Sequence, residues 1–309
     1  VGCRRPRLAH YTSPSMPQIS ANRIQIEYES FGSPAAPAVL LVMGLGAQLG
    51  RWPVELCQAL VARGFRVIRF DNRDCGLSSK LDEAGVPDIA RALRTGQAPQ
   101  TAYTLDDMAA DSVGLLDALE VERAHIVGAS MGGAIAQIVA ARYAARILSL
   151  TCIMTTSGHP ELPAPTPEAA RALFAPLPPA RDKESLIEDA IRRQLAVASP
   201  DYPSCPQRLR EQFTIEHERG FHPRGVTRQL AAFLASSDRR ALLQTISVPT
   251  LVLHGALDPL IPVACGYDVA AHIPGARIRV IEGMAHDLPL ALTDVFADEI
   301  AGLARASAP

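Results

Sequence analysis

The stretch that decides the fold is HIVGASMGGAIAQIVAARY, residues 125–143. An apolar run ends at Gly128, and Ser130 is followed by Gly132 and Gly133 before an apolar helical pattern begins. A strand that turns sharply into a helix strains the backbone of the serine and crowds its neighbours, so small residues are needed around it. This G-x-S-x-G pattern predicts a serine hydroxyl exposed at the carboxyl end of a sheet. The alternative is a serine that only caps a helix.

Short apolar runs bounded by turn residues recur along the chain, at 38–42, 66–70, 124–128, 147–154, 250–255 and 277–283. Segments with a helical period lie between most of them, at 52–64, 105–119 and 134–144. Strands without a polar face that alternate with helices indicate an α/β fold, with a mostly parallel sheet covered on both sides. The run at 23–32 alternates instead, which predicts an antiparallel edge strand.

The alternation of strands and helices stops near residue 156, where a proline-dense segment begins. Helical patterns without strand signals then continue from about Leu186 to Leu243. An insertion of this kind between two core strands predicts a helical cap, or lid. We therefore expect a core at 16–155 and 248–309, a cap at 156–247, and a flexible N-terminal extension at 1–15. Candidates for lining a pocket beneath the cap are Phe174, Leu177, Phe213, Phe221, Leu230 and Phe233.

Charge and composition exclude several classes of function. The chain has 309 residues and a formal net charge of −2, which gives no electrostatic case for binding nucleic acid or an anionic membrane surface. No apolar run approaches the roughly 18 residues of a membrane span, and no apolar leader follows the basic opening segment. The scattered cysteines lack metal-ligand spacing and are interpreted as reduced and structural. We expect a soluble cytoplasmic protein, with a homo-oligomer left open.

A serine hydroxyl is a weak nucleophile, so it needs an imidazole base whose tautomer is fixed by a carboxylate. In a fold of this kind the chain order is serine, acid, histidine. The histidines after Ser130 that do not fit lie in the insertion, precede every suitable acid or end a helical stretch: His159, His217, His222, His254 and His272. His286 remains, in a turn between the last strand and the final helix.

The matching acid is Asp258, in the turn that follows the apolar run at 250–255. Asp258, His286 and Ser130 each come just after a strand, so all three are expected to meet at one edge of the sheet. An aspartate before proline is also a common structural turn. Asp287 and Asp71 are rival acids, although Asp71 is better interpreted as holding its own loop together with Arg73.

These residues resemble the α/β-hydrolase superfamily, in its single-cap branch of small esterases and related hydrolases. The motifs are LLVMGLG, VIRFDNRDCGLSS, HIVGASMGG, TLVLHGALDPLIP and EGMAHDLP. The amino-acid sequences of these loops are most similar to those of esterases of the aclacinomycin methylesterase type. The resemblance implies an oxyanion hole formed by the backbone N–H groups of Leu45 and Met131, with Gly46 as the alternative to Leu45. Met43 stands where the family usually has histidine, which leaves backbone donors unaffected.

The resemblance implies a serine hydrolase that cleaves carboxylic esters of small to medium apolar substrates through an acyl-enzyme intermediate, without metal or organic cofactor. A proline-type aminopeptidase and a carbon–carbon bond hydrolase are alternatives that share the chemistry. The peptidase would need cap carboxylates from among Glu161, Glu168, Glu184, Glu188, Glu211, Glu216 and Glu218, which are better interpreted as solvated helix faces. A ligand receptor with little turnover is the alternative from another class. Trp52 either lines the site or packs beneath it.

Overall fold

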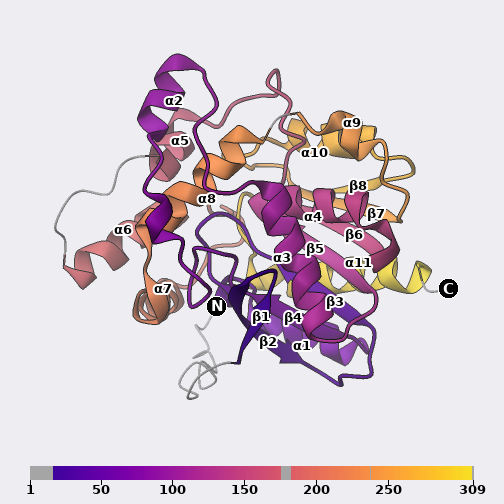
Figure 1. Cartoon of the computed structure of the whole chain (residues 1–309). Coiled ribbons are helices and arrows are strands. Elements are labelled where there is room, and N and C mark those ends of the chain that lie inside the picture. The colour runs from indigo at the N-terminus through magenta and orange to yellow at the C-terminus, as the bar shows by residue number, and fades with distance from the viewer. Residues whose placement is uncertain (1–16, 175–181, 237, 308–309) are drawn as a thin grey trace.

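The structure, a computed structural model, describes residues 17–174, 182–236 and 238–307 (Figure 1). The extension expected at 1–15 lies outside these residues. The described strands form one eight-stranded sheet in the order β1-β2-β4-β3-β5-β6-β7-β8. Their bounds are β1 (Gln18–Ala21), β2 (Ile24–Phe31), β3 (Ala38–Val42), β4 (Arg66–Phe70), β5 (Ala124–Ala129), β6 (Ile147–Ile153), β7 (Thr250–Gly255) and β8 (Arg277–Ile281).

The predicted parallel sheet is confirmed. Strands β4, β3, β5, β6, β7 and β8 pair in parallel, and β2 runs antiparallel to β4 as the alternating pattern predicted. The prediction that this strand forms the edge is wrong, because β1 pairs with its outer side in antiparallel register, from Gln18 opposite Glu27 to Ala21 opposite Ile24. Strand β1 has four residues and buries only Ala21, so its sequence carries too little pattern to reveal it.

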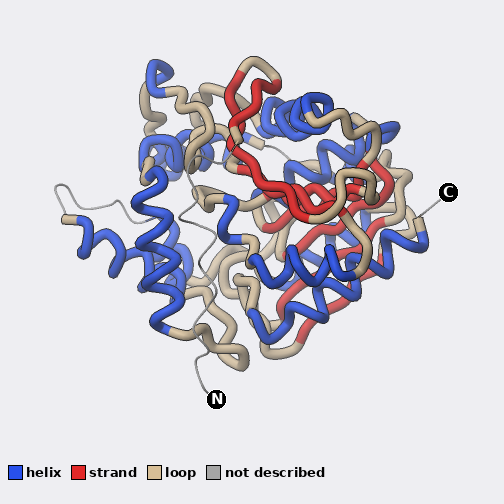
Figure 2. The backbone as a smooth tube through the Cα atoms, turned by 90° about the horizontal axis from the view of Figure 1, so that it is seen from below, coloured by secondary structure: helices blue, strands red, loops and turns tan. Residues whose placement is uncertain are grey.

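Helices cover both faces of the sheet, as Figure 2 shows. One face packs against α3 (Leu105–Ala118), α4 (Met131–Arg142) and α10 (Val263–His272), and the other against α1 (Val54–Ala62) and α11 (Thr293–Ala306). In β5, Ile126 joins the first of these cores and Val127 the second. Successive side chains of a strand point to opposite faces, so a strand buried on both sides needs an unbroken apolar run.

A segment rich in helices connects β6 to β7. Its described helices are α5 (Pro167–Phe174), α6 (Lys183–Leu195), α7 (Pro206–Gly220), α8 (Pro223–Ala235) and α9 (Arg240–Leu243). Figure 1 shows α5 to α8 gathered at one side of the core. The helices expected here are present, while the role of the segment as a cap stays a prediction.

A short helix outside this segment, α2 (Ile89–Thr95), was not predicted and contacts α8. Its ends do carry signals: the side chain of Asp88 accepts a hydrogen bond from the Arg91 N–H at 2.8 Å, and Gly96 ends the helix in the left-handed conformation.

Cys57, Cys75, Cys152 and Cys265 are free and buried, as structural cysteines should be. Cys205 is disulfide-bonded, so the expectation of reduced cysteines is wrong at that position. In the part of the chain that the structure describes, every helix is too short or too polar to cross a lipid bilayer.

Candidate active site

Ser130 occupies the sharp turn between β5 and α4. Its φ of 56° and ψ of −124° lie in a region that residues other than glycine rarely adopt. Two hydrogen bonds hold it there, from the Ser130 N–H to the Ile153 carbonyl at 2.9 Å and from Thr155 Oγ1 to the Ser130 carbonyl at 2.8 Å. The Ser130 side chain makes no capping hydrogen bond to α4, so the alternative reading as a helix cap is not supported.

The glycines around Ser130 are required by close backbone contacts. A Cβ added at Gly128 would lie 2.2 Å from the carbonyl oxygen of Gly132, and one added at Gly132 would lie 2.1 Å from the carbonyl oxygen of Val42. A Cβ at Gly133 would lie 2.6 Å from the Cβ of Thr155. The tight turn that presents the serine therefore depends on all three glycines.

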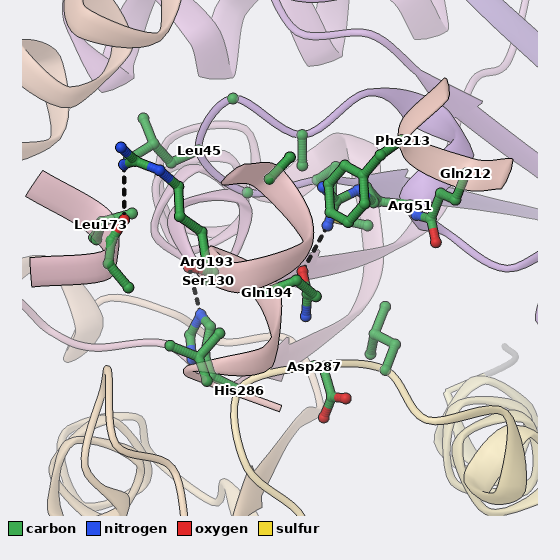
Figure 3. Close-up of a pocket in the computed structure, with 18 of the residues that line it drawn as sticks. Leu45, Arg51, Ser130, Leu173, Arg193, Gln194, Gln212, Phe213, His286 and Asp287 are labelled. Atoms are coloured by element: carbon green, nitrogen blue, oxygen red, sulfur yellow. Dashed lines mark hydrogen bonds between the residues drawn. The ribbon is translucent and has the colours of Figure 1, made fainter. Parts of the chain in front are cut away.

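The structure brings Ser130, His286 and Asp258 together. Ser130 Oγ lies 3.1 Å from His286 Nε2, and His286 Nδ1 lies 2.7 Å from Asp258 Oδ2. Figure 3 shows the histidine directed at the serine within the pocket. When Nδ1–H donates to the carboxylate, Nε2 is left as the acceptor for the serine hydroxyl, which is the tautomer that a general base requires.

Asp258 is held as an ionised carboxylate. Its Oδ1 accepts the N–H groups of Leu260 at 2.9 Å and Ile261 at 2.8 Å, and its Oδ2 faces His286. Burial alone would raise the pKa of Asp258, but the adjacent His286 and these hydrogen bonds hold the pKa well below its usual range. His254 stands beside the pair and bonds to the Ile261 carbonyl through Nε2 at 2.8 Å. The carboxylate is thus fixed and charged next to the imidazole.

The rival acid Asp287 is turned away from His286. It accepts a hydrogen bond from the Ser199 hydroxyl, and burial raises the pKa of its carboxyl. Ser199 Oγ also accepts the Ala285 N–H at 2.8 Å, and the His286 N–H donates to the Val197 carbonyl at 2.9 Å. The loop that carries His286 is therefore bonded to the chain that follows α6.

The other rival acid, Asp71, binds backbone N–H groups of neighbouring loops. Its carboxylate accepts the N–H groups of Leu49 at 2.7 Å and Leu77 at 2.9 Å. Arg73 forms a buried pair with Asp111 at 2.6 Å. Both side chains match the structural role expected for them.

The two predicted oxyanion donors flank Ser130. Met131 begins α4, and Leu45 lies in the loop after β3, where a Cβ added to the adjacent Gly44 would be 3.0 Å from the Ser130 Cβ. The alternative donor is already engaged: the Gly46 N–H donates to Gln229 Oε1 at 2.8 Å. This contact favours Leu45 over Gly46.

A cavity of about 2360 Å³ is lined by Ser130, His286, Leu45 and Met131 together with side chains of the inserted segment. Of the apolar candidates, Phe213, Phe221, Leu230 and Phe233 line it. Leu177 lies outside the described residues. Trp52 is fully buried in the core beneath the sheet and does not appear among the lining residues.

Polar groups line another part of the same cavity, and Figure 3 shows several of them. Arg51 Nη1 donates to Gln194 Oε1 at 2.7 Å, and its guanidinium lies 4.3 Å from the ring centre of Phe213. Arg208 makes a two-point ion pair with Glu55 at 2.7 and 2.8 Å. Among the described residues, no group of three or more His, Cys, Asp or Glu side chains is arranged to hold a metal ion.

Comparisons with known proteins agree with this fold. Residues 37–197 match the family model described as the alpha/beta hydrolase fold. The chain is 30% identical over 308 residues to rhodomycin D methylesterase of Streptomyces peucetius, with 94% of this chain and 98% of that protein covered. It is similar to the solved enol-lactonase of Burkholderia xenovorans LB400, with 25% identity, a TM-score of 0.70 and coverage of 93% and 99%. A meta-cleavage product hydrolase of Pseudomonas fluorescens IP01 shares the fold, with 22% identity, a TM-score of 0.74 and coverage of 94% and 98%.

Proposed function

The chain belongs to the α/β-hydrolase family, and from that premise we propose that it is a serine esterase that works through an acyl-enzyme intermediate. The observation that carries the proposal is the hydrogen-bonded series from Asp258 through His286 to Ser130, which opens into a large cavity. A strained serine, an imidazole of fixed tautomer and an ionised carboxylate together meet the requirements of nucleophilic catalysis.

In the proposed mechanism, His286 Nε2 takes the proton of Ser130 as Oγ attacks the ester carbonyl carbon. The carbonyl oxygen becomes an oxyanion that accepts hydrogen bonds from the Leu45 and Met131 N–H groups. Collapse of this intermediate breaks the bond to the alkoxy oxygen, which leaves as the alcohol after it receives the proton from His286. Water then attacks the acyl-enzyme by the same route and releases the acid.

The substrate we propose is an ester of a bulky, largely apolar acid with a small alcohol. The relative from Streptomyces peucetius is named a methylesterase, which supports a small alcohol. A cavity of about 2360 Å³ exceeds the roughly 300–1,000 Å³ of ordinary ligand pockets, which supports an acid larger than the sequence suggested. In this proposal residues 156–247 act as the cap, since Phe213, Leu230 and Phe233 contribute apolar wall.

The other functions considered from the sequence receive less support. The seven glutamates considered for a peptidase, Glu161, Glu168, Glu184, Glu188, Glu211, Glu216 and Glu218, do not appear among the described residues that line the cavity. Glu216 is instead within salt-bridge distance of Arg51. Carbon–carbon bond hydrolysis and a receptor role would use the same triad residues, so turnover measurements have to separate them.

The test is steady-state hydrolysis of methyl esters whose acids increase from butyrate to polycyclic aromatic acids, with Asp258→Asn and Asp287→Asn as a matched pair. We expect kcat/KM to rise with the size of the acid. Asp258→Asn should reduce kcat by about 10⁴-fold because the histidine loses its tautomer, while Asp287→Asn should cost about tenfold or less. Ser130→Ala should abolish both turnover and labelling by a fluorophosphonate.

Three outcomes would count against the proposal. Equal losses in the two aspartate variants would remove Asp258 from the mechanism. Turnover that survives in Ser130→Ala would remove the acyl-enzyme. A single burst without steady turnover of any ester would favour the receptor role.

A further inference from the structure

Two side chains from distant parts of the sequence hold the loop that carries Leu45. Asn72 Nδ2 donates to the Met43 carbonyl at 2.8 Å, and Gln229 Oε1 accepts the Gly46 N–H at 2.8 Å. These contacts lie on either side of the peptide between Gly44 and Leu45. That peptide carries the Leu45 N–H, so its position is bracketed by two buried amide side chains.

The orientation of this peptide is also fixed. The Ala47 N–H donates to the Gly44 carbonyl at 3.3 Å. Because the N–H and C=O of a trans peptide point in opposite directions, the Leu45 N–H points away from Ala47. Gly44 and Gly46 would otherwise give the loop wide conformational freedom, and Gly46 already has a φ of 64°. Side-chain contacts are therefore needed to keep the donor in one place.

Gln229 is well placed to supply such a contact. It is fully buried in α8, and its Nε2 donates to the Arg73 carbonyl at 2.7 Å while Oε1 faces the Gly46 N–H. If the amide were flipped, its NH₂ group would face the Gly46 N–H and its oxygen would face the Arg73 carbonyl. The hydrogen-bond partners therefore assign the orientation of the Gln229 amide. The adjacent Arg228 anchors α8 through a fully buried ion pair with Asp74 at 2.7 Å.

We propose that Gln229 is a positioning residue for the oxyanion hole, so that the inserted segment supplies part of the catalytic apparatus. This inference rests on the proposed esterase function. Gln229 touches neither the serine nor a substrate in this assignment; it acts by fixing Gly46 and thereby the Leu45 N–H. Because oxyanion donors act mainly in the transition state, losing Gln229 should lower kcat and leave KM nearly unchanged. A residue that only docks α8 would lower stability instead.

The experiment compares the wild type with Gln229→Met, Gln229→Glu and Gln229→Asn on one ester. Gln229→Met keeps the length and loses the acceptor, so kcat should fall by roughly 10- to 100-fold, somewhat less than complete loss of a donor. Gln229→Glu in its protonated form, which burial favours, keeps an acceptor for the Gly46 N–H and a donor for the Arg73 carbonyl, so its kcat should stay within about threefold of wild type. A trifluoromethyl ketone, which forms a tetrahedral adduct on the serine, should lose affinity for Gln229→Met by the same factor as kcat/KM.

Asp82→Ala is the matched control, because Asp82 accepts a hydrogen bond from Arg228 Nη2 at 3.0 Å and the substitution removes this contact to α8 without touching the loop. It should lower Tm and leave kcat unchanged. The inference is overturned if Gln229→Met keeps the wild-type kcat, or if kcat falls while affinity for the ketone does not. Should Gln229→Met fail to fold, Gln229→Asn, whose shorter amide cannot reach Gly46, is judged by the same criteria. An inert wild type would overturn the esterase function itself, and this inference with it.

Discussion

Gly132→Ala places a methyl group where the structure has no room for it. The added Cβ would lie 2.1 Å from the Val42 carbonyl oxygen and 2.7 Å from the Met43 carbonyl oxygen. Val42 ends β3, a central strand paired with β4 and β5, so these main-chain atoms cannot withdraw without breaking the sheet. The contact has to be relieved by moving α4 and, with it, Ser130.

The cost can be bounded from general magnitudes. Overpacking a core usually costs about 1–3 kcal/mol of unfolding free energy and occasionally more. Because the added methyl group meets backbone atoms of a central strand, we take the steric cost at Gly132 as about 4 kcal/mol. Alanine recovers about 1 kcal/mol of helix propensity, which leaves a net loss of about 3 kcal/mol. For this chain of 309 residues, an unfolding entropy of about 2.1 cal/mol/K per residue turns that loss into a fall in Tm of about 5 °C.

Gly302→Ala provides the matched control. Gly302 is an exposed residue within α11, and a Cβ added there meets nothing within 4 Å. The substitution should therefore stabilise the protein by about 0.5–1 kcal/mol through helix propensity alone. Urea unfolding followed by circular dichroism measures both variants. A Gly132→Ala variant within about 0.5 kcal/mol of wild type would refute the steric argument.

Three further predictions follow from buried contacts. Burial lowers the pKa of His125 from 6.5 to about 4, so the unfolded chain binds more protons than the folded chain between these pH values. Acidification from pH 7 to pH 5 should therefore lower the free energy of unfolding by about 2 kcal/mol, and His125→Asn should make this pH dependence weaker. Arg228→Met leaves Asp74 buried without its partner and should cost about 3–5 kcal/mol in urea unfolding, part of which Asp74→Asn in the same chain should restore. Ser199→Ala loosens the loop of His286 and should lower kcat by about 2- to 10-fold at unchanged KM.

The sheet could be predicted well because its strands are buried on both faces. The runs at 38–42, 66–70 and 250–255 coincide with β3, β4 and β7, since a strand covered on both sides is mostly apolar and stops where turn residues begin. Strand β1 was not predicted because it is short and mostly exposed. Helix α2 was not predicted because only Ala92 of its seven residues is buried.

The proposed triad could be located from sequence because each member stands beside a local signal. Ser130 sits among glycines, Asp258 follows a buried strand, and His286 follows the last one. Gln229 and Ser199 have no such signal. Each acts through a hydrogen bond to a backbone group far away in the chain, and nothing in the residues next to either one indicates which loop it will meet.

The contacts of the inserted segment also limit how a substrate can enter. The segment bonds to the oxyanion loop through Gln229 and to the histidine loop through Val197, so lifting it as a rigid body would disorganise both loops that the proposed chemistry needs. The cavity wall also includes apolar side chains that remain exposed: Val86 and Leu93 on either side of the start of α2, Phe221 after α7, and Leu290 close in sequence to His286. Exposed apolar groups that belong to a cavity wall mark its mouth. Entry past α2 leaves both of these loops in place. Substitutions near α2 should therefore alter the preference for substrate size without altering the proposed chemistry.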